Sequence, residues 1–335
     1  MRLLVTGGAG FIGSNYVRHR LATFPDDSVR VLDKLTYAGR RENLDDLDSE
    51  RLDLVVADIA DREAVSAAVD GCDAIVNFAA ESHVDRSVES PTEFIETDVF
   101  GTYVLVEAAR DAEIRHLQIS TDEVYGDFEQ GSATESSPLD PSSPYSASKA
   151  GGDLITSAFV RTYGGDALIT RASNNYGPRQ HPEKLIPLCI LNALAGDPLP
   201  VYGDGSQVRN WLYVEDFCRA IDVVLEKGEA GLAYNVGGPD ELENIEVVKR
   251  ILELTGRDES LIEYVTDRPG HDRRYSLASE RLNALGWSPQ VDFAEGIGLT
   301  VDWYGKNEDW WEPIRSGEYR EYYERTYGRE LGSRG

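Results

Sequence analysis

The stretch VTGGAGFIGS, residues 5 to 14, decides the fold. It follows the apolar segment RLLVT (2–6) and leads into a segment of helical character. Its glycines, Gly7, Gly10 and Gly13, let the backbone turn tightly and approach a ligand closely. A strand, a glycine turn and a helix in this order place a helix N-terminus against an anion such as a pyrophosphate. The stretch therefore predicts the first strand and helix of a dinucleotide-binding sheet.

An acidic residue completes this motif. Asp33 ends the next apolar segment, VRVLD (29–33), 20 residues after Gly13, and a carboxylate at this place binds the hydroxyls of an adenosine ribose. Because Asp33 would repel a ribose 2′-phosphate, the motif favours NAD over NADP, although the neighbouring Lys34 leaves NADP open. A tight turn of purely structural use is the alternative to an NAD site.

More apolar segments, rich in valine, isoleucine and leucine, alternate with helical ones at residues 52–58, 73–79, 114–120 and 166–173. This pattern is typical of a parallel sheet covered by helices on both faces. From about residue 175, five prolines divide the chain into shorter pieces, and helices are expected near 214–227 and 244–256. We predict an α/β fold: a Rossmann-type doubly wound parallel sheet with the cofactor and catalytic residues (1–175), and a smaller mixed C-terminal substrate lobe (176–335). Some segments of the lobe are expected to return to the sheet.

Ligands of a doubly wound sheet bind beyond the carboxyl ends of its strands. Asp58 and Ile59 follow the third apolar segment, and we expect them to flank the adenine. Ala79, Ala80 and Ser82 follow the fourth segment and are expected at the nicotinamide half of the cofactor.

Charge and hydropathy restrict the partners and the compartment. The 335 residues include 60 acidic and 33 basic ones, for a net charge of −27, which argues against nucleic-acid binding because that needs a basic surface. So acidic a chain repels itself in dilute buffer, and salt screens the repulsion. We therefore hypothesise a halophilic source, with an ordinary acidic protein as the alternative. No apolar run is long enough to span a membrane, and a cytoplasmic protein is expected.

The three cysteines, Cys72, Cys189 and Cys218, are scattered along the chain. They lack the spacing of a zinc site or of a disulfide framework. We expect them in the core, and we expect no metal.

The segment PYSASKAGGD (144–153) contains Tyr145 and Lys149, four residues apart and hence on one face of an expected helix. Lowering a tyrosine pKa from about 10 to near 7 takes roughly 4 kcal/mol, which a lysine ammonium and a positive nicotinamide can supply in a closed site. Thr121, after Ser120, is placed to hydrogen-bond a hydroxyl that is oxidised. These residues predict hydride transfer, with an exposed helical pair as the alternative.

Two adjacent carboxylates, Asp122 and Glu123, follow directly in ISTDEVYG (119–126). Acidic residues are poor strand formers, and successive side chains of a strand point to opposite faces. Both carboxylates therefore reach one substrate only if the strand stops by Thr121. One carboxyl can then donate a proton while the other accepts one. An acid and a base beside a hydride site indicate elimination coupled to redox chemistry, and a solvated acidic turn is the alternative.

Taken together, these motifs resemble the dTDP-glucose 4,6-dehydratases of the extended short-chain dehydrogenase/reductase superfamily. The resemblance covers nearly the whole chain, including the G-x-x-G-x-x-G turn, STDEVYG, PYSASKAG, VYGDGSQVRNWLYVED and DRPGHDRRY. Its specific part is the acid pair, because related epimerases and reductases share the other elements without it. The resemblance implies retained NAD, a homodimer paired through helices near 92–111 and 143–163, and a place in deoxysugar biosynthesis, such as the rhamnose pathway.

The resemblance also implies a reaction cycle on a nucleoside-diphosphate glucose. Tyr145 deprotonates the sugar 4-hydroxyl as hydride leaves C4 for NAD. The 4-ketone acidifies the proton on C5, which Glu123 removes, while Asp122 protonates the departing C6 hydroxyl. Hydride then returns from NADH to C6 and leaves a 4-keto-6-deoxy sugar.

By the same resemblance, further residues are assigned to the two ligands. The cofactor contacts named above are joined by Phe11, Ile12, Leu35, Thr36, Thr97 and Asn175. The substrate contacts are Thr121, His83, Asn174, Lys184, Leu185, Pro200, Tyr202, Arg209, Asn244, Arg268 and His271. Without the resemblance, the two arginines could be ordinary ion pairs and His271 a surface residue.

Two positions depart from the family pattern. Asp98 stands in ETDVFGTY where asparagine is usual, and Phe217 follows VED where histidine is usual. Neither is expected to touch the chemistry, although Asp98 could alter the packing behind the cofactor. The alternative functions are a nucleotide-sugar 4-epimerase, a dehydratase of a UDP- or GDP-sugar and, more remotely, a non-catalytic NAD-binding regulator.

Overall fold

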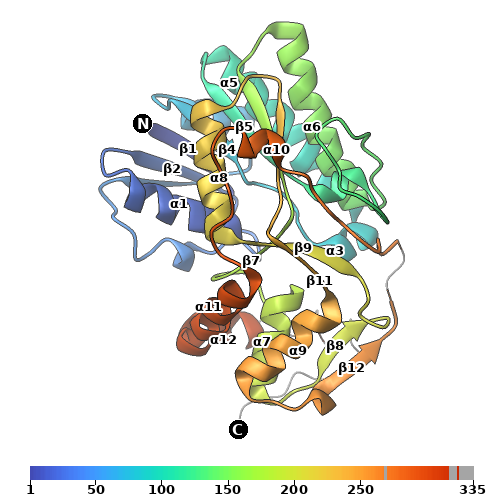
Figure 1. The fold of residues 1–335 in the computed structure, drawn as a ribbon. Helices are drawn as coiled ribbons and strands as arrows, with labels where there is room; N and C mark the ends of the chain where they lie inside the picture. The colour runs from blue at the N-terminus through green and yellow to red at the C-terminus, as the bar shows by residue number, and fades with distance from the viewer. Residues whose placement is uncertain (268–269, 317–322, 324–335) are drawn as a thin grey trace.

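Seven parallel strands form the main sheet of the computed structural model, which describes residues 1–267, 270–316 and 323 (Figure 1). The strands are β1 (Arg2–Thr6), β2 (Ser28–Asp33), β3 (Leu52–Val56), β4 (Ala74–Asn77), β5 (Arg115–Thr121), β6 (Ala167–Ala172) and β10 (Ala233–Val236). Their order is β10-β6-β5-β4-β1-β2-β3. The order reverses between β1 and β4, where a doubly wound sheet binds its ligand. The predicted fold class is confirmed.

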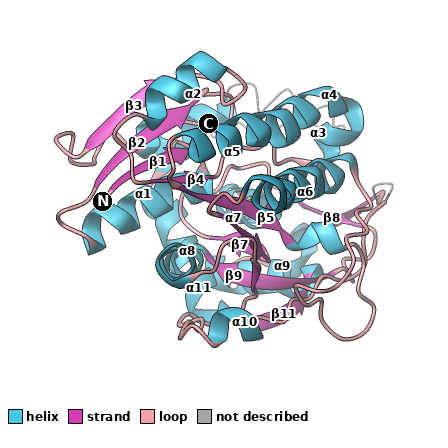
Figure 2. Cartoon of the chain, turned by 90° about the horizontal axis from the view of Figure 1, so that it is seen from above, coloured by secondary structure: helices cyan, strands magenta, loops and turns pink. Residues whose placement is uncertain are grey.

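Helices cover both faces of this sheet because its strands are apolar on both sides. Leu3 and Val5 pack under α1 (Phe11–Thr23) and α8 (Val214–Lys227), whereas Leu4 packs under α2 (Arg62–Val69) and α5 (Thr102–Asp111). This alternation follows from the two-residue period of a strand. The long helix α6 (Pro144–Tyr163) lies beside α5 (Figure 2). All three cysteines are buried, as expected.

The smaller lobe has its own sheets and core. A three-stranded sheet has the order β11-β9-β7, and β12 pairs with β8. These strands are β7 (Asn174–Tyr176), β8 (Leu199–Tyr202), β9 (Val208–Tyr213), β11 (Asp240–Glu243) and β12 (Ile262–Val265). Its helices are α7 (Leu185–Ala195), α9 (Asn244–Thr255), α11 (Phe293–Lys306) and α12 (Glu308–Ser316). The two helices predicted from the later sequence are confirmed as α8 and α9. Of the later elements, β10 belongs to the main sheet and α8 packs on one face of that sheet.

Short elements connect these parts. They are η1 (Arg41–Asn43), α3 (Val84–Glu89), α4 (Pro91–Phe94), the π-helical η2 (Ile95–Gly101), η3 (Asp122–Tyr125), η4 (Glu259–Leu261) and α10 (Glu280–Asn283). The segment predicted as one helix near 92–111 is therefore divided among α4, η2 and α5.

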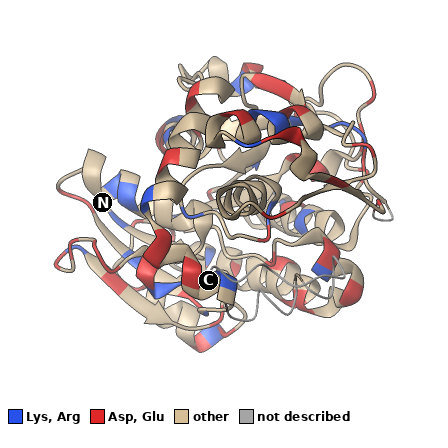
Figure 3. Cartoon of the chain, turned by 90° about the horizontal axis from the view of Figure 1, so that it is seen from below, with Lys and Arg blue, Asp and Glu red and all other residues tan. Residues whose placement is uncertain are grey.

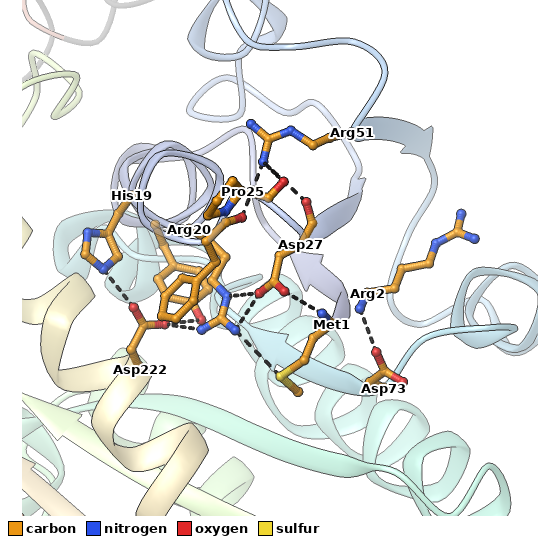
Figure 4. Close-up of polar contacts among 11 residues, drawn as sticks. Met1, Arg2, His19, Arg20, Pro25, Asp27, Arg51, Asp73 and Asp222 are labelled. Atoms are coloured by element: carbon orange, nitrogen blue, oxygen red, sulfur yellow. Dashed lines mark hydrogen bonds and ion pairs between the residues drawn. The ribbon is translucent and has the colours of Figure 1, made fainter.

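A buried ion network joins α1 to α8 (Figure 4). The guanidinium of Arg20, which is 2% exposed, lies between two carboxylates. Its Nε donates to Asp27 Oδ2 at 2.7 Å, and its Nη1 donates to Asp222 Oδ1 at 2.8 Å. The second oxygen of Asp222 lies 2.7 Å from His19 Nε2. Removing one partner from such a network would leave a buried charge without its counter-charge, which is destabilising. The network therefore holds α8, which comes late in the sequence, against α1 in the first part of the chain.

Figure 3 shows acidic residues on helices and loops in many parts of the chain. Within residues 1–267, 270–316 and 323, no histidine, cysteine, aspartate and glutamate side chains gather in a way that would hold a metal ion. The same residues contain no helix of the length and apolarity needed to cross a bilayer.

Candidate active site

The glycine turn forms the floor of a cavity at the reversal of strand order. Gly7 has φ +66°, and a Cβ there would lie 2.5 Å from the backbone nitrogen of Ala79. A Cβ on Gly13 would overlap the carbonyl of Gly7. Side chains at these positions would collide with neighbouring backbone, so the glycines keep the turn tight and leave the start of α1 accessible to a pyrophosphate. The turn therefore fits a dinucleotide.

Asp33 is held at the end of β2 by backbone donors. The N–H of Ala9 donates to Oδ2 at 2.9 Å and that of Leu35 to Oδ1 at 2.8 Å. The ammonium of Lys34 lies 2.7 Å from Asp58 Oδ2. Asp58 already neutralises the charge of Lys34, so this lysine is not free to bind a ribose 2′-phosphate. The geometry therefore favours NAD over NADP.

The cavity has a volume of about 310 Å³ and runs from the glycine turn to the carboxyl ends of β5 and β6. Most of the predicted cofactor and catalytic residues line it. They are Gly7, Gly10, Phe11, Ile12, Gly13, Asp33, Lys34, Thr36, Asp58, Ile59, Ala79, Ala80, Ser82, Thr97, Thr121, Asp122, Glu123, Tyr145, Lys149 and Asn175. Leu35 does not line the cavity, and its backbone N–H instead holds the carboxylate of Asp33. These residues fit NAD, whose nicotinamide supplies the hydride acceptor and donor.

Tyr145 and Lys149 enter the cavity from the first turns of α6. Ser143 caps this helix in a capping box, which fixes where it begins. The ammonium of Lys149 is buried and donates to the carbonyl of Ile119 at 2.8 Å. Burial and the carboxylate of Glu123 hold the pKa of Tyr145 well above its usual value. The folded chain alone therefore does not produce the expected lowering of this pKa.

The acid pair lies in the turn η3, since β5 ends at Thr121 as the prediction required. Thr121 Oγ1 donates to Asp122 Oδ1 at 3.1 Å and accepts from the backbone N–H of Glu123 at 3.3 Å. Asp122 is 2% exposed, and its Oδ2 has no hydrogen-bond partner among the described residues. Burial and Glu123 raise the pKa of Asp122 to about 8. Burial and the neighbouring carboxylate therefore favour the protonated form of Asp122 near neutral pH.

The predicted substrate residues divide into those that line the cavity and those that lie away from it. Asn174 and Lys184 line the cavity, whereas His83, Leu185, Pro200, Tyr202, Arg209, Asn244 and His271 do not. Arg268 lies outside the described residues. The rings of Tyr202 and His271 meet edge to face, with centroids 6.1 Å apart. Arg209 is 5% exposed, and its guanidinium lies 4.3 Å from the ring centroid of Tyr275.

Arg209 lies near the acid pair. It donates to the backbone carbonyls of Val208, Asp272 and Arg273. Its positive charge acts on Asp122, where it opposes the rise of the carboxyl pKa. An arginine held in place by carbonyls near two carboxylates is suited to a diphosphate or a sugar oxygen.

Several lining residues were not predicted. Glu81, Gln180, His181 and Glu183 also border the cavity. Three of them belong to RQHPEKL (179–185), which precedes α7. The only local signal there is Pro182, which indicates a loop and not a ligand.

The two departures from the family pattern lie at the cavity and behind α6. Phe217 lines the cavity. Asp98 is buried behind α6, where its Oδ2 accepts a hydrogen bond of 2.6 Å from Ser148 Oγ. Burial raises the pKa of Asp98 to about 6, against the opposing effect of Lys149. Asp98 thus lies in the packing behind the cavity, and whether either residue affects the chemistry stays a prediction.

Comparison with known proteins agrees with this geometry. Residues 4–300 match the family model described as GDP-mannose 4,6 dehydratase. The chain is 55% identical to the low-salt glycan biosynthesis protein Agl12 of Haloferax volcanii, over 91% of this chain and 98% of that protein. It is 50% identical to the dTDP-glucose 4,6-dehydratase of Streptomyces niveus, over 94% and 96% of the two chains.

A solved structure is equally similar. The crystal structure of a DesIV double mutant, a dTDP-glucose 4,6-dehydratase from Streptomyces venezuelae with NAD bound, has a TM-score of 0.92 and 54% sequence identity. The match covers 94% of this chain and 100% of that one. With a family model along most of its length and relatives of about half identity along nearly all of it, this chain belongs to the GDP-mannose 4,6 dehydratase family and, within it, to the dTDP-glucose 4,6-dehydratases.

Proposed function

We propose that the chain converts a nucleoside-diphosphate glucose, namely dTDP-glucose, to the 4-keto-6-deoxy sugar with internal oxidation and reduction by bound NAD. The observation that carries this proposal is the acid pair in η3. Asp122 is buried with a raised pKa, and Glu123 lies next to it in the same cavity as Tyr145 and Lys149. An oxidoreductase or epimerase needs no such acid and base, whereas elimination of water needs both.

The residues have distinct roles in this proposal. Tyr145 accepts the proton of the sugar 4-hydroxyl, and Thr121 orients that hydroxyl. Glu123 removes the proton from C5 once C4 is a ketone. Asp122 gives its proton to the C6 hydroxyl, which leaves as water. Because Oδ1 of Asp122 already accepts from Thr121, the oxygen available to hold and deliver the proton is Oδ2.

A product assay tests this function. Purified protein is incubated with dTDP-, UDP- and GDP-glucose without added NAD, and the products are identified by mass spectrometry. Loss of water from dTDP-glucose, with faster turnover than for the other two, is expected. An isomer of unchanged mass would indicate a 4-epimerase. Absence of turnover on every sugar nucleotide would leave only a binding role.

Turnover is expected to fall as the pH rises through about 8, because Asp122 must carry a proton to release the C6 hydroxyl and its pKa is about 8. NADH formation in the first half of the cycle does not use this proton, so its rate should not fall with pH in the same way as turnover. Steady-state turnover and single-turnover NADH absorbance, both measured against pH, separate the two. A turnover profile that is flat across this range would contradict the role of Asp122.

The proposed assembly is a homodimer. Large apolar side chains are exposed on α3, η2 and α6, among them Val88, Ile95, Phe100, Leu154 and Tyr163. Leu154 is 61% exposed at the surface of α6, and exposed apolar side chains of this kind are suited to an interface between two copies of the chain. Light scattering in molar salt is expected to give the mass of a dimer, and Leu154→Glu that of a monomer. A fully active wild-type monomer would contradict this.

Stability is expected to increase with salt. The net charge of −27 makes the folded chain repel itself, and the Debye length shortens from about 10 Å at 0.1 M to about 3 Å at 1 M. The melting temperature should therefore rise between dilute buffer and molar sodium chloride. A melting temperature that stays constant or falls would remove the proposal of a halophilic protein.

A further inference from the structure

Three segments that are distant in the sequence meet at Glu183. Its carboxylate side chain has no exposed surface. Oε1 accepts a hydrogen bond of 3.0 Å from the hydroxyl of Tyr37, and Oε2 lies 3.4 Å from Arg86 Nε. The guanidinium of Arg86 also lies over the ring of Tyr37, 3.9 Å from its centroid. The loop after β2, helix α3 and the segment before α7 are thereby joined by one carboxylate.

These contacts lie beside the cofactor cavity, which Glu183 lines and which Tyr37 and Arg86 do not. Thr36, Ala38 and Gly39, on either side of Tyr37, line the cavity together with the glycine turn. Glu183 lines it from the opposite segment, and the next residue, Lys184, donates to the carbonyl of Ser82 at 2.5 Å. The segment before α7 is thus tied both to the loop at the adenosine end and to the end of β4 at the nicotinamide end.

The charges at this junction favour a closed state at neutral pH. Burial holds the pKa of Tyr37 far above its usual value, so the phenol keeps the proton that it donates. His181 lies 3.8 Å from Glu183 Oε1, but burial lowers its pKa to about 3, so it is neutral. Arg86 is a permanent cation beside the buried carboxylate, and His83 Nε2 also lies 4.0 Å from Glu183 Oε2.

We propose that Tyr37, Arg86 and Glu183 form a latch that must open before NAD can leave the cavity. The inference rests on the proposed function in one respect: a cycle that regenerates NAD needs no exchange of cofactor, so a closed exit does not slow it. The rate of NAD release is then set by the fraction of molecules with the latch open.

The variant Tyr37→Phe tests the latch with the smallest change. It removes the hydroxyl that binds Glu183 and keeps the ring that contacts Arg86 and His181. Loss of a hydrogen bond to a charged group changes an equilibrium by a factor on the order of 10 to 100. The protein is loaded with labelled NAD, excess unlabelled NAD is added, and the retained label is followed. Release is expected to be faster by that factor, and turnover of the variant should depend on added NAD.

A matched control distinguishes the latch from general loosening. Tyr103→Phe removes a hydrogen bond of the same kind, from a tyrosine hydroxyl to the carboxylate of Glu107 at 3.0 Å, on α5 outside the cavity. Its NAD release should equal that of the wild type. Glu183→Gln, checked for folding by its melting temperature, is expected to release NAD faster, as Tyr37→Phe does.

Three results would overturn the latch. They are NAD release within twofold of the wild type in folded Tyr37→Phe, equal acceleration in Tyr103→Phe, and a wild type that does not retain NAD. If Glu183→Gln does not fold, Tyr37→Phe decides alone. A wild type that retains NAD but forms no keto sugar would contradict the proposed function and leave the release measurements valid.

Discussion

Phenylalanine in place of Tyr145 is expected to slow NADH formation from bound NAD by about 10²- to 10⁴-fold in a single turnover, the usual contribution of a general base. The hydroxyl is the group that accepts the proton of the sugar 4-hydroxyl. The phenylalanine ring keeps the edge-to-face contact with Phe94, whose centroid lies 6.3 Å away. The variant therefore loses the proton acceptor without losing its packing. Because oxidation precedes elimination, formation of the 4-keto-6-deoxy product should fall by the same factor.

The control for this experiment lies on the same helix. Tyr163→Phe makes the identical chemical change at the exposed far end of α6 and should leave the rate of NADH formation unchanged. Both rates are followed by NADH absorbance after mixing with dTDP-glucose. Wild-type NADH formation in Tyr145→Phe would show that another group accepts the proton.

The sequence predicted the sheet well because each early strand carries its own signal. Apolar segments bounded by turns gave β1 to β6, and the glycine turn fixed where α1 begins. The strand β10 could not be assigned because AYNV (233–236) is short and contains a buried asparagine, Asn235. Its burial comes from pairing with β6, more than sixty residues earlier in the chain, which no local pattern records.

The candidate site was predictable to the extent that its residues are neighbours in sequence. Tyr145 and Lys149 share a helix face, and Asp122 and Glu123 share one turn. The contact between Tyr37 and Glu183 joins positions 146 residues apart, so no local sequence pattern could predict it. The spacing of Tyr145 and Lys149 also gave no account of the nearby carboxylates, which raise the tyrosine pKa in the folded chain.

Glutamine in place of Glu123 is expected to separate the two halves of the reaction. It keeps the shape of the side chain and removes the proposed base for C5, while Tyr145, Lys149 and Thr121 stay in place. Turnover should fall by about 10²- to 10⁴-fold. NADH should still form from bound NAD and should accumulate, because the 4-keto sugar cannot eliminate water and no acceptor for the hydride arises at C6.

Solvent isotope provides the second readout for this variant. In deuterated water the wild type should place deuterium at C5 of the product, since the proton that Glu123 removes exchanges with solvent before C5 is protonated again. The matched control Glu129→Gln, at an exposed position six residues later, should show wild-type turnover and labelling. If Glu123→Gln turned over normally, the carboxylate would be a solvated turn residue. If it lost NADH formation as well, Glu123 would instead support the Tyr145 site, and the assignment of acid and base in TDEVYG would have to be abandoned.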